Sequence, residues 1–416
     1  MKRVVITGMG AITPLGNSVD EFWNNAKEGK SGAAAITRFD TTHFKTKFAS
    51  EVKGFEPEKY LDRNEIRRSD LFTQYALYAA SEAMKDSGLQ LDSISPFDIG
   101  VIWGSGQGGM DTFEKEVKEY IVNDSKPHFS PFFVPKLIAN MASGMISIKF
   151  GLMGINYTTV SACATSNSAI MDAFNYIRLG KAKVFVTGGS EAPITEASIG
   201  GFNAMRAMST DNDNPTAASK PFDAERKGFV IGEGAGALIV EEYEHAKKRG
   251  AKIYAEIVGA SMTADAYHIS ATHPDGLGAA KAMELAMEEA GVSPNEIDYL
   301  NAHATSTPTG DLSEIMAIKK VFGEQPEKLK ISATKSMTGH LLGAAGAIEG
   351  ILSIKAIQEG IIPPTINTTI IDPAIPKGFN IVTQKAVKAK VDLAMSSTFG
   401  FGGHNAIVIF KKVDES

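Results

Sequence analysis

The stretch NYTTVSACATSNSAIMDAFNYIRLG, residues 156–180, contains the single cysteine of this 416-residue chain. A strand-like run gives way to small residues around Cys163 and then to a helical pattern, which predicts a strand, a turn and a helix. A second stretch, LKISATKSMTGHLLGAAGAIEGILSIKAIQEG at residues 329–360, repeats that order. Gly180 and Gly360 each suit the left-handed position that follows a helix. A duplicated unit of this kind predicts two turns that meet at one site, and chance similarity between two ordinary α/β units is the alternative.

Cys163 allows two interpretations. A lone cysteine is most often a small buried apolar residue with no chemical role. At the start of a helix, however, unpaired backbone N–H groups and the helix dipole favour a thiolate. Two histidines in distinctive loops, His303 and His340, lie far downstream. A cysteine with distant histidines is typical of covalent thiol chemistry, so we expect Cys163 to be a nucleophile.

The composition excludes several classes of protein. With 43% hydrophobic and 22% charged residues the chain is typical of globular proteins, and its net charge of −6 gives no reason to expect nucleic-acid binding. One cysteine excludes an intrachain disulfide and fits a reducing compartment. The opening residues MKRVVITGMG leave no room for a signal peptide, and no run approaches the ~18 apolar residues of a spanning helix. We therefore expect a cytoplasmic protein without nucleic-acid or membrane partners.

Short β-branched runs alternate with longer helical patterns along the whole chain, which predicts an α/β layered fold. The expected strands cover residues 3–7, 98–103, 183–187, 237–241 and 297–300, with a C-terminal hairpin of 391–397 and 405–411. The expected helices cover residues 71–87, 168–179, 279–290 and 341–358.

His303 follows one of these strands, within the segment NAHATSTPTGD at residues 301–311. Open α/β sheets place ligand sites at such strand ends, although a structural histidine fits equally well. Thr305 and Thr307 alternate just beyond it, and their hydroxyls suit either the amide groups of a ligand or the local backbone.

Two carboxylates follow this segment. Asp311 and Glu314 have the spacing of a capping box for a helix that begins near Leu312. We therefore expect them to be structural.

Lys335 and His340 lie in a segment rich in glycine and alanine between Gly339 and Ala347. Such residues indicate close backbone approach and burial, and a buried lysine requires a partner. Glu349 on the following helix is the expected partner. At a helix start the dipole disfavours imidazolium, so His340 should stay neutral and able to donate an N–H to a developing negative oxygen.

Glycines at positions 400, 402 and 403 mark the turn STFGFGGHN, residues 397–405. They allow backbone N–H groups to point at a ligand. One such N–H, together with that of Cys163, would form an oxyanion hole. An ordinary tight hairpin is the alternative.

Taken together, these segments resemble the elongating β-ketoacyl-acyl carrier protein synthases, and among them the synthase II type. The resemblance runs nearly end to end, from VVITGMGAITPLGNSVDEFW at residues 4–23 to FGFGGHNAIVIFKK at residues 399–412. It implies the thiolase-like fold, in which two similar halves pack as αβαβα layers and the protein is usually a homodimer. The halves would be residues 1–250, with the cysteine, and residues 251–416, with the His/Lys/His set.

The resemblance also implies roles for individual residues. Cys163 resembles the nucleophile that takes an acyl chain as a thioester. His303 and His340 resemble the pair that binds the malonyl thioester carbonyl and promotes loss of CO2. Lys335, held by Glu349, resembles the residue that positions and electrostatically tunes the His303 side.

Further positions are implied around the substrate. Phe401 resembles a gating phenylalanine whose N–H contributes to the oxyanion hole, and Thr305 and Thr307 match threonines that contact a phosphopantetheine arm. The remaining substrate-binding positions are Gln107, Phe202 and Gly402. The positions that would dock the acidic acyl carrier protein are Arg63, Arg67, Arg68 and Arg206, although a solvated basic face is the usual role of such a cluster.

The family needs no cofactor of its own, because the carrier protein brings the phosphopantetheine. It requires no metal, although members often hold a monovalent cation, here near Asn301 and Glu349. Gln107 departs from relatives of known long-chain preference, which often carry an apolar residue there. A polar side chain would shorten the acyl tunnel or pair with a neighbour, so the resemblance does not determine which acyl chain length the protein prefers.

The implied reaction is a decarboxylative condensation. Malonyl-acyl carrier protein would lose CO2 and extend by two carbons the acyl chain held on Cys163, in fatty-acid synthesis. A stand-alone polyketide ketosynthase is the main alternative. A non-decarboxylating thiolase-type acyltransferase typically uses a second cysteine, and a Cys–His hydrolase would leave the second histidine and Lys335 unexplained.

Overall fold

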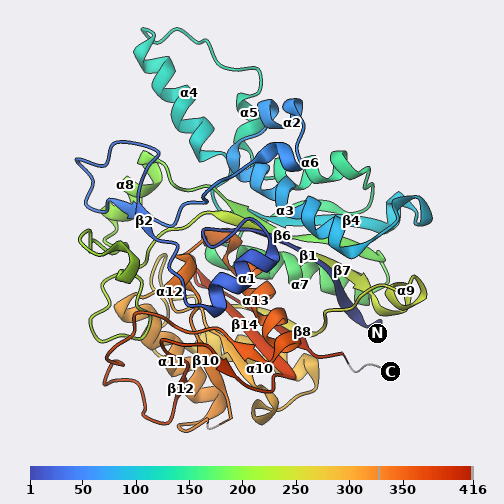
Figure 1. Cartoon of the computed structure of the whole chain (residues 1–416), viewed down its shortest axis with the longest axis vertical. Coiled ribbons are helices and arrows are strands. Elements are labelled where there is room, and N and C mark those ends of the chain that lie inside the picture. Colours follow the sequence, from blue (N-terminus) through green and yellow to red (C-terminus); the bar gives the residue numbers. More distant parts are fainter. Residues whose placement is uncertain (327, 414–416) are drawn as a thin grey trace.

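A computed structural model of the chain describes residues 1–326 and 328–413 (Figure 1). Its centre is a mixed sheet with the strand order β12-β10-β9-β14-β15-β8-β1-β7-β6-β4-β5. These strands are β1 (Val4–Ile12), β4 (Ile99–Gly104), β5 (Asn156–Thr159), β6 (Val184–Glu191), β7 (Gly234–Glu242), β8 (Ala255–Ala264), β9 (Tyr299–Asn301), β10 (Lys330–Ser332), β12 (Asn380–Ile381), β14 (Leu393–Gly400) and β15 (His404–Lys411). Two small separate sheets pair β2 (Ala34–Ala35) with β3 (Phe48–Ala49) and β11 (Ile361–Ile362) with β13 (Val387–Lys388).

Helices cover this sheet on both faces (Figure 1). They are α1 (Val19–Lys27), α2 (Arg63–Arg68), α3 (Leu71–Ser87), α4 (Met110–Val122), α5 (Phe133–Leu137), α6 (Met141–Phe150), α7 (Thr165–Arg178), α8 (Glu196–Ala204), α9 (Tyr243–Lys248), α10 (Leu277–Ala290), α11 (Pro308–Phe322), α12 (Lys335–Thr338) and α13 (Ala345–Glu359). Within the described ranges, none has both the length and the apolar character that crossing a bilayer requires.

The strand order is the same in the two parts of the sheet. In the first part β1 pairs antiparallel with β7 and β7 with β6, while β6, β4 and β5 run parallel. In the second part β8 pairs antiparallel with β15 and β15 with β14, while β14, β9 and β10 run parallel. An antiparallel pairing of β1 with β8 joins them. The weak internal repeat in the sequence therefore reflects a duplicated topology.

The layers follow from the contacts of the helices. The helices α7 and α13 pack against each other between the two parts of the sheet, since each contacts strands of both. The helix α3 covers the outer face over β1, β6 and β7, whereas α10 covers β8 and β15, with α11 packed on α10. This order of helix, sheet, helices, sheet, helices is the expected αβαβα arrangement. Because α13 is covered on all sides it is buried along most of its length, as its apolar composition requires.

The two central helices begin side by side. A 3₁₀ turn, Ala162–Ala164, precedes α7, and another, Leu342–Ala344, precedes α13; the two turns contact each other. Each turn begins with a non-glycine residue at positive φ, 50° at Ala162 and 48° at Leu342. Such backbone costs about 1–3 kcal/mol and persists only where the surrounding packing enforces it. The duplicated units therefore bring two strained turns together at one point.

The predicted elements agree with most of these boundaries, and Gly180 and Gly360 have the expected positive φ, 69° and 63°. The helix expected at 341–358 is wrong at its start, because α13 begins only at Ala345. The reason is the left-handed backbone at Leu342, which a regular helix cannot contain.

Candidate active site

A cavity of about 450 Å³ opens where the two turns meet. Its wall includes Cys163, His303, His340 and Phe401, which the sequence places in four separate segments. Of the other predicted positions, Gln107, Phe202, Thr305, Thr307 and Arg206 also line it. Lys335 and Gly402 are not on the wall of this cavity. The structure thus brings together most of the site that the sequence predicts.

Cys163 lies in the first 3₁₀ turn, directly before α7, and only 8% of its surface is exposed. The backbone N–H groups of Phe401 and of Cys163 itself point at the sulfur. Gly400 makes this approach possible, since a Cβ atom there would lie 3.0 Å from the Cys163 nitrogen and 2.5 Å from the Ser161 carbonyl oxygen. Two backbone donors therefore lie beside the sulfur.

The charge state of the thiol differs from the expectation. The pKa of Cys163 is raised to about 12: burial raises it most and the charge of Glu191 also raises it, while Lys335 and the N–H groups of Phe401 and Cys163 lower it. The predicted thiolate is therefore wrong for this structure, because the donors at the helix start do not offset burial. At neutral pH the sulfur holds its proton and needs an acceptor before it can attack.

His303 and His340 stand nearly perpendicular, with their ring centroids 5.3 Å apart and an angle of 87° between planes. Burial lowers the pKa of both imidazoles well below the usual value, and the charge of Lys335 lowers both further. Both rings are therefore neutral at pH 7. Neutral His340 was expected, but the cause is burial and Lys335, since this residue lies between α12 and the second 3₁₀ turn, outside any helix.

The backbone of His303 is held by a carboxylate. Its N–H donates to Glu314 Oε1 at 2.8 Å, and the Ala304 N–H donates to Oε2 at 2.7 Å. The Ser397 hydroxyl donates to Oε1 at 2.8 Å. Glu314 is fully buried in the second turn of α11, which begins at Pro308, so its expected capping role is wrong. The capping-type spacing did indicate a carboxylate that binds backbone N–H groups, but not which backbone.

Asp311, like Glu314, is a buried carboxylate that accepts hydrogen bonds from backbone N–H groups outside its own helix. Its Oδ1 accepts from the Ser306 N–H at 3.1 Å, and its Oδ2 accepts from the Phe222 N–H at 2.9 Å. It therefore anchors the loop that carries Thr305 and Thr307, and it caps no helix. The hydroxyls of these two threonines lie 3.1 Å apart on the cavity wall.

The backbone of His340 is fixed on both sides. Its N–H donates to the Val230 carbonyl at 2.7 Å, and its own carbonyl accepts from the Gly232 N–H at 2.9 Å. The ring meets Phe229 edge-on, with centroids 5.6 Å apart. Phe399 lies beside His303 with the ring centroids 5.4 Å apart and the ring planes tilted at 56°. Neither phenylalanine was predicted as a site residue, because the sequence alone does not show which aromatic side chains reach the cavity.

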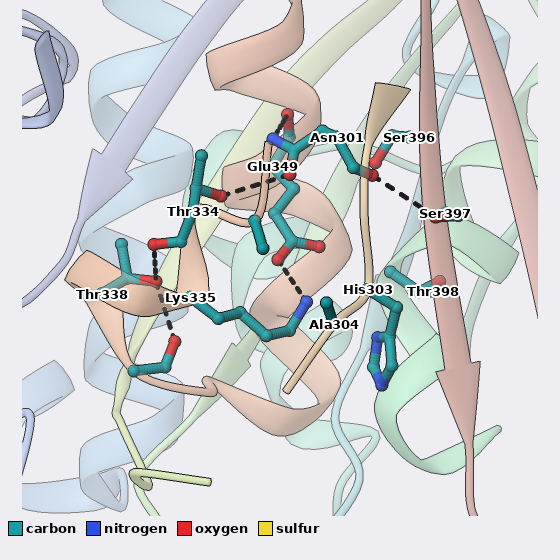
Figure 2. Close-up of polar contacts among 12 residues, drawn as sticks. Asn301, His303, Ala304, Thr334, Lys335, Thr338, Glu349, Ser396, Ser397 and Thr398 are labelled. Carbon is teal, nitrogen blue, oxygen red and sulfur yellow. Dashed lines mark hydrogen bonds and ion pairs between the residues drawn. The ribbon is translucent and has the colours of Figure 1, made fainter. Parts of the chain in front are cut away.

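Lys335 forms an ion pair with Glu349 (Figure 2), and neither residue lies on the wall of the cavity. The lysine Nζ binds Glu349 Oε1, and both side chains are almost completely buried. This confirms the expected pair. Because a buried ammonium needs such a counterion, Glu349 is what allows Lys335 to place a positive charge near Cys163, His303 and His340.

Asn301 lies beside this ion pair (Figure 2). Its Oδ1 accepts from the Thr334 hydroxyl at 3.2 Å, and its Nδ2 donates to the Glu349 carbonyl oxygen at 3.4 Å. Glu349 Oε2 and the Ser396 hydroxyl are buried here without a hydrogen-bond partner among the described residues. Within residues 1–326 and 328–413, no group of three or more His, Cys, Asp or Glu side chains could hold a metal ion.

The four predicted arginines fall into two groups. Arg206 is exposed at the cavity, whereas Arg63, Arg67 and Arg68 are exposed on α2 and do not line it. Gly402 donates its N–H to the Ile269 carbonyl at 2.8 Å, which ties the glycine turn to a neighbouring loop.

Gln107 has a polar partner on the cavity wall. Its Oε1 accepts from the Ser198 hydroxyl at 2.9 Å. Of the two arrangements expected for this side chain, pairing with a neighbour is therefore present.

The chain was compared with known proteins. The family described as "Beta-ketoacyl synthase, N-terminal domain" matches residues 1–246, and its C-terminal domain matches residues 254–369. A Staphylococcus aureus protein named 3-oxoacyl-[acyl-carrier-protein] synthase 2 is 50% identical over 413 residues, which cover 99% of each chain. A Synechocystis protein of the same name is 46% identical over 412 residues, 99% of this chain and 98% of that one.

Two solved structures resemble the whole chain. A β-ketoacyl synthase from Burkholderia phymatum superposes with a TM-score of 0.92 at 36% identity and covers 100% of both chains. A type II polyketide ketosynthase in complex with its acyl-carrier protein superposes with a TM-score of 0.90 at 34% identity, over 99% of this chain and 100% of that one.

The raised pKa of Cys163 has a direct consequence for alkylation. Iodoacetamide reacts with the thiolate, so the labelling rate of the folded protein should still rise steeply at about pH 9.5, where a thiol with the ordinary pKa of ~8.5 is close to its maximum rate. Intact-protein mass at about pH 6 to about pH 9.5 measures the rate, and the single cysteine makes the adduct unambiguous. The same chain unfolded in urea is the control and should titrate at the ordinary value. A folded-state midpoint at or below that of the unfolded chain would contradict the assignment.

Proposed function

The chain belongs to the β-ketoacyl synthase family of acyltransferases, and we propose that it is a 3-oxoacyl-[acyl-carrier-protein] synthase of fatty-acid biosynthesis. It condenses malonyl-acyl carrier protein with an acyl chain held on Cys163, extends that chain by two carbons and releases CO2. The observation that best supports this proposal is the common cavity of one cysteine, two neutral histidines and two backbone donors aimed at the sulfur.

The first half-reaction loads the acyl chain. The Cys163 sulfur attacks the carbonyl carbon of the incoming thioester, and its proton passes to an acceptor in the cavity, where the neutral imidazoles are available. Negative charge that develops on the carbonyl oxygen meets the N–H groups of Cys163 and Phe401. Collapse of this intermediate expels the carrier thiol. One thioester replaces another, so the acyl group stays activated without ATP.

The second half-reaction forms the carbon–carbon bond. His303 and His340 donate N–H groups to the malonyl thioester carbonyl, and the C–C bond to the carboxylate breaks to release CO2. The electrons of that bond form an enolate whose oxygen both neutral donors stabilise. The enolate carbon then attacks the acyl thioester on Cys163 and displaces the sulfur. Burial lowers the pKa of both imidazoles most, and Lys335, paired with Glu349, favours this chemistry because its charge lowers both pKa values further.

The substrate arm enters past residues of the cavity mouth. Thr305 and Thr307 contact the pantetheine arm, while Phe401 and Gly402 form the gate over the cysteine. Gln107 and Phe202 contact the acyl chain. The exposed positions that receive the acidic carrier are Arg63, Arg67, Arg68 and Arg206. The carrier brings the pantetheine, so the enzyme requires no cofactor of its own.

We further propose a homodimer. The strand β5 lies at the end of the sheet order and pairs only with β4 within the described residues. An unpaired edge of this kind is a template for pairing with a second chain. Large apolar side chains are exposed around it, with Ile148, Met153 and Val160 at 77%, 60% and 62%. These features support association of two copies along β5.

The proposal divides the chain into a half of residues 1–250, with the nucleophile, and a half of residues 251–416, with the His/Lys/His set. A cytoplasmic location suits the enzyme, because its one nucleophilic thiol must stay reduced.

A monovalent cation near Asn301 and Glu349 is part of the proposal. The buried oxygens without partners, Glu349 Oε2 and Ser396 Oγ, lie beside Asn301, and oxygen donors of this type suit such an ion. It would stabilise the carboxylate that holds Lys335, and no step of the reaction passes through it.

Substitution of the two central residues should separate the half-reactions. Cys163→Ala lacks the nucleophile and should form no acyl adduct with acyl-acyl carrier protein, as intact mass would show. His303→Ala keeps the sulfur, its two N–H donors and His340 as an acceptor for the thiol proton, so it should acylate normally but condense ~10²-fold more slowly. A full adduct on Cys163→Ala, or equal loss of both half-reactions in His303→Ala, would refute the assigned roles.

Replacement of Gln107 tests the wall of the acyl cavity. Gln107→Ile removes the bond to Ser198 and adds an apolar branched side chain, so the preferred acyl length should shift. Ser198→Ala removes the same bond without new bulk and serves as the matched control. Relative kcat/KM over a ladder of acyl carriers measures the profile. If Gln107→Ile retains the profile of the parent enzyme, this residue does not form the wall of the acyl tunnel.

A further inference from the structure

Glu191 is a buried carboxylate on the wall of the same cavity as Cys163. It ends β6, and one of its oxygens, Oε1, accepts three hydrogen bonds. The donors are the Ser105 hydroxyl at 2.7 Å, the Gly106 N–H at 2.6 Å and the Gln107 N–H at 3.1 Å. All three belong to the loop after β4. Because Gln107 is also part of the cavity wall, this carboxylate fixes one side of the acyl cavity.

The second 3₁₀ turn approaches the same carboxylate. The Gly343 N–H points toward Glu191 from the centre of that turn. A Cβ atom at Gly343 would lie 2.8 Å from the Gly106 nitrogen and 3.4 Å from the Glu191 carboxylate carbon. Only glycine therefore lets the loop, the turn and the carboxylate meet. Gly343 takes the place in the second turn that Cys163 takes in the first.

The charge of Glu191 opposes that of Lys335 at the cysteine. Glu191 raises the pKa of Cys163, whereas Lys335 lowers it. Lys335 is paired with Glu349. Glu191, in contrast, has no cation among its hydrogen-bond partners. The Oε2 atom of Glu191 is buried and forms no hydrogen bond with any of the described residues. Burial raises the pKa of Glu191 to about 7, so the carboxylate is ionised above neutral pH, and no partner then neutralises its charge in the cavity that it shares with the thiol.

We propose that Glu191 is a positioning residue with two effects: it ties the 105–107 loop to the 342–344 turn, and its negative charge restrains the reactivity of Cys163. The proposal deepens the proposed function and rests on it. A restrained thiol stays protonated, which protects it from oxidation and alkylation in the absence of a thioester. The other titratable groups that face the sulfur are Lys335 from α12, His303 from the loop after β9 and His340 from the segment before the second turn.

Two variants separate the two effects. Glu191→Gln keeps an acceptor oxygen for the loop but removes the charge. Its thiol should titrate lower, and iodoacetamide should label it about threefold to tenfold faster than wild type at a fixed pH that lies above the pKa of Glu191 and below the midpoint of the thiol. Glu191→Asp keeps the charge but draws the carboxylate away from the loop. Its labelling rate should match wild type, while backbone amides of residues 105–107 should exchange hydrogen faster.

Glu82→Gln is the matched control. Glu82 is another largely buried carboxylate whose pKa burial raises to about 7, and it binds the backbone N–H groups of Ala11 and Val19 away from the cavity. Its loss should leave labelling of Cys163 unchanged, whereas acceleration equal to that of Glu191→Gln would assign the effect to general loosening and overturn the proposal.

Three other outcomes would overturn it: no acceleration in folded Glu191→Gln, equal acceleration in Glu191→Asp, or unchanged amide exchange at 105–107 in Glu191→Asp. If Glu191→Gln does not fold, the exchange measurement on Glu191→Asp still decides whether Glu191 holds the 105–107 loop. Both readouts use the full chain without acyl substrate, so they remain interpretable even if condensation activity is absent.

Discussion

The site depends on the contact between two short turns that open the central helices. Each turn begins with an L-residue in the left-handed region, Ala162 before α7 and Leu342 before α13. The helices can bring these turns together because Gly346 presses against Asn167, where a Cβ atom would lie 2.5 Å from the Asn167 Oδ1. The Ala347 N–H also donates to the Ser166 hydroxyl at 2.9 Å. Without this close crossing, Cys163 and His340, which lie far apart in sequence, would not share a cavity.

Burial then determines the chemistry of the groups that meet there. The low dielectric of the cavity raises the pKa of Cys163 and lowers the pKa of His303 and His340, so all three are neutral at rest. Charged imidazoles would bind the malonyl carboxylate, which must leave as CO2. Neutral imidazoles instead remain available to donate their N–H groups to the enolate oxygen. The buried ion pair of Lys335 and Glu349 adds the fixed positive charge that this arrangement requires.

Local patterns predicted much of this structure. The repeated strand–turn–helix order predicted the duplicated topology, and Gly180 and Gly360 predicted the ends of two helices. Lys335, which lies in an apolar segment, predicted a buried ion pair with Glu349. The sequence could not give properties that depend on distant packing. The thiol pKa is one of these, because a helix start predicts a thiolate unless the depth of burial is known. The anchoring roles of Glu191 and Glu314 are others, since the N–H groups that they bind lie on other loops.

The account holds that the sulfur and the two imidazoles act on one pair of substrates in one cavity. The most direct measurement starts from enzyme carrying an acyl group on Cys163 and adds malonyl-acyl carrier protein labelled with carbon-13 in its free carboxyl group. We expect the acyl adduct to disappear in step with an equimolar release of labelled CO2, and an unlabelled 3-oxoacyl product two carbons longer. Labelled CO2 that forms while the adduct remains, or loss of the adduct as free acid without CO2, would contradict the account.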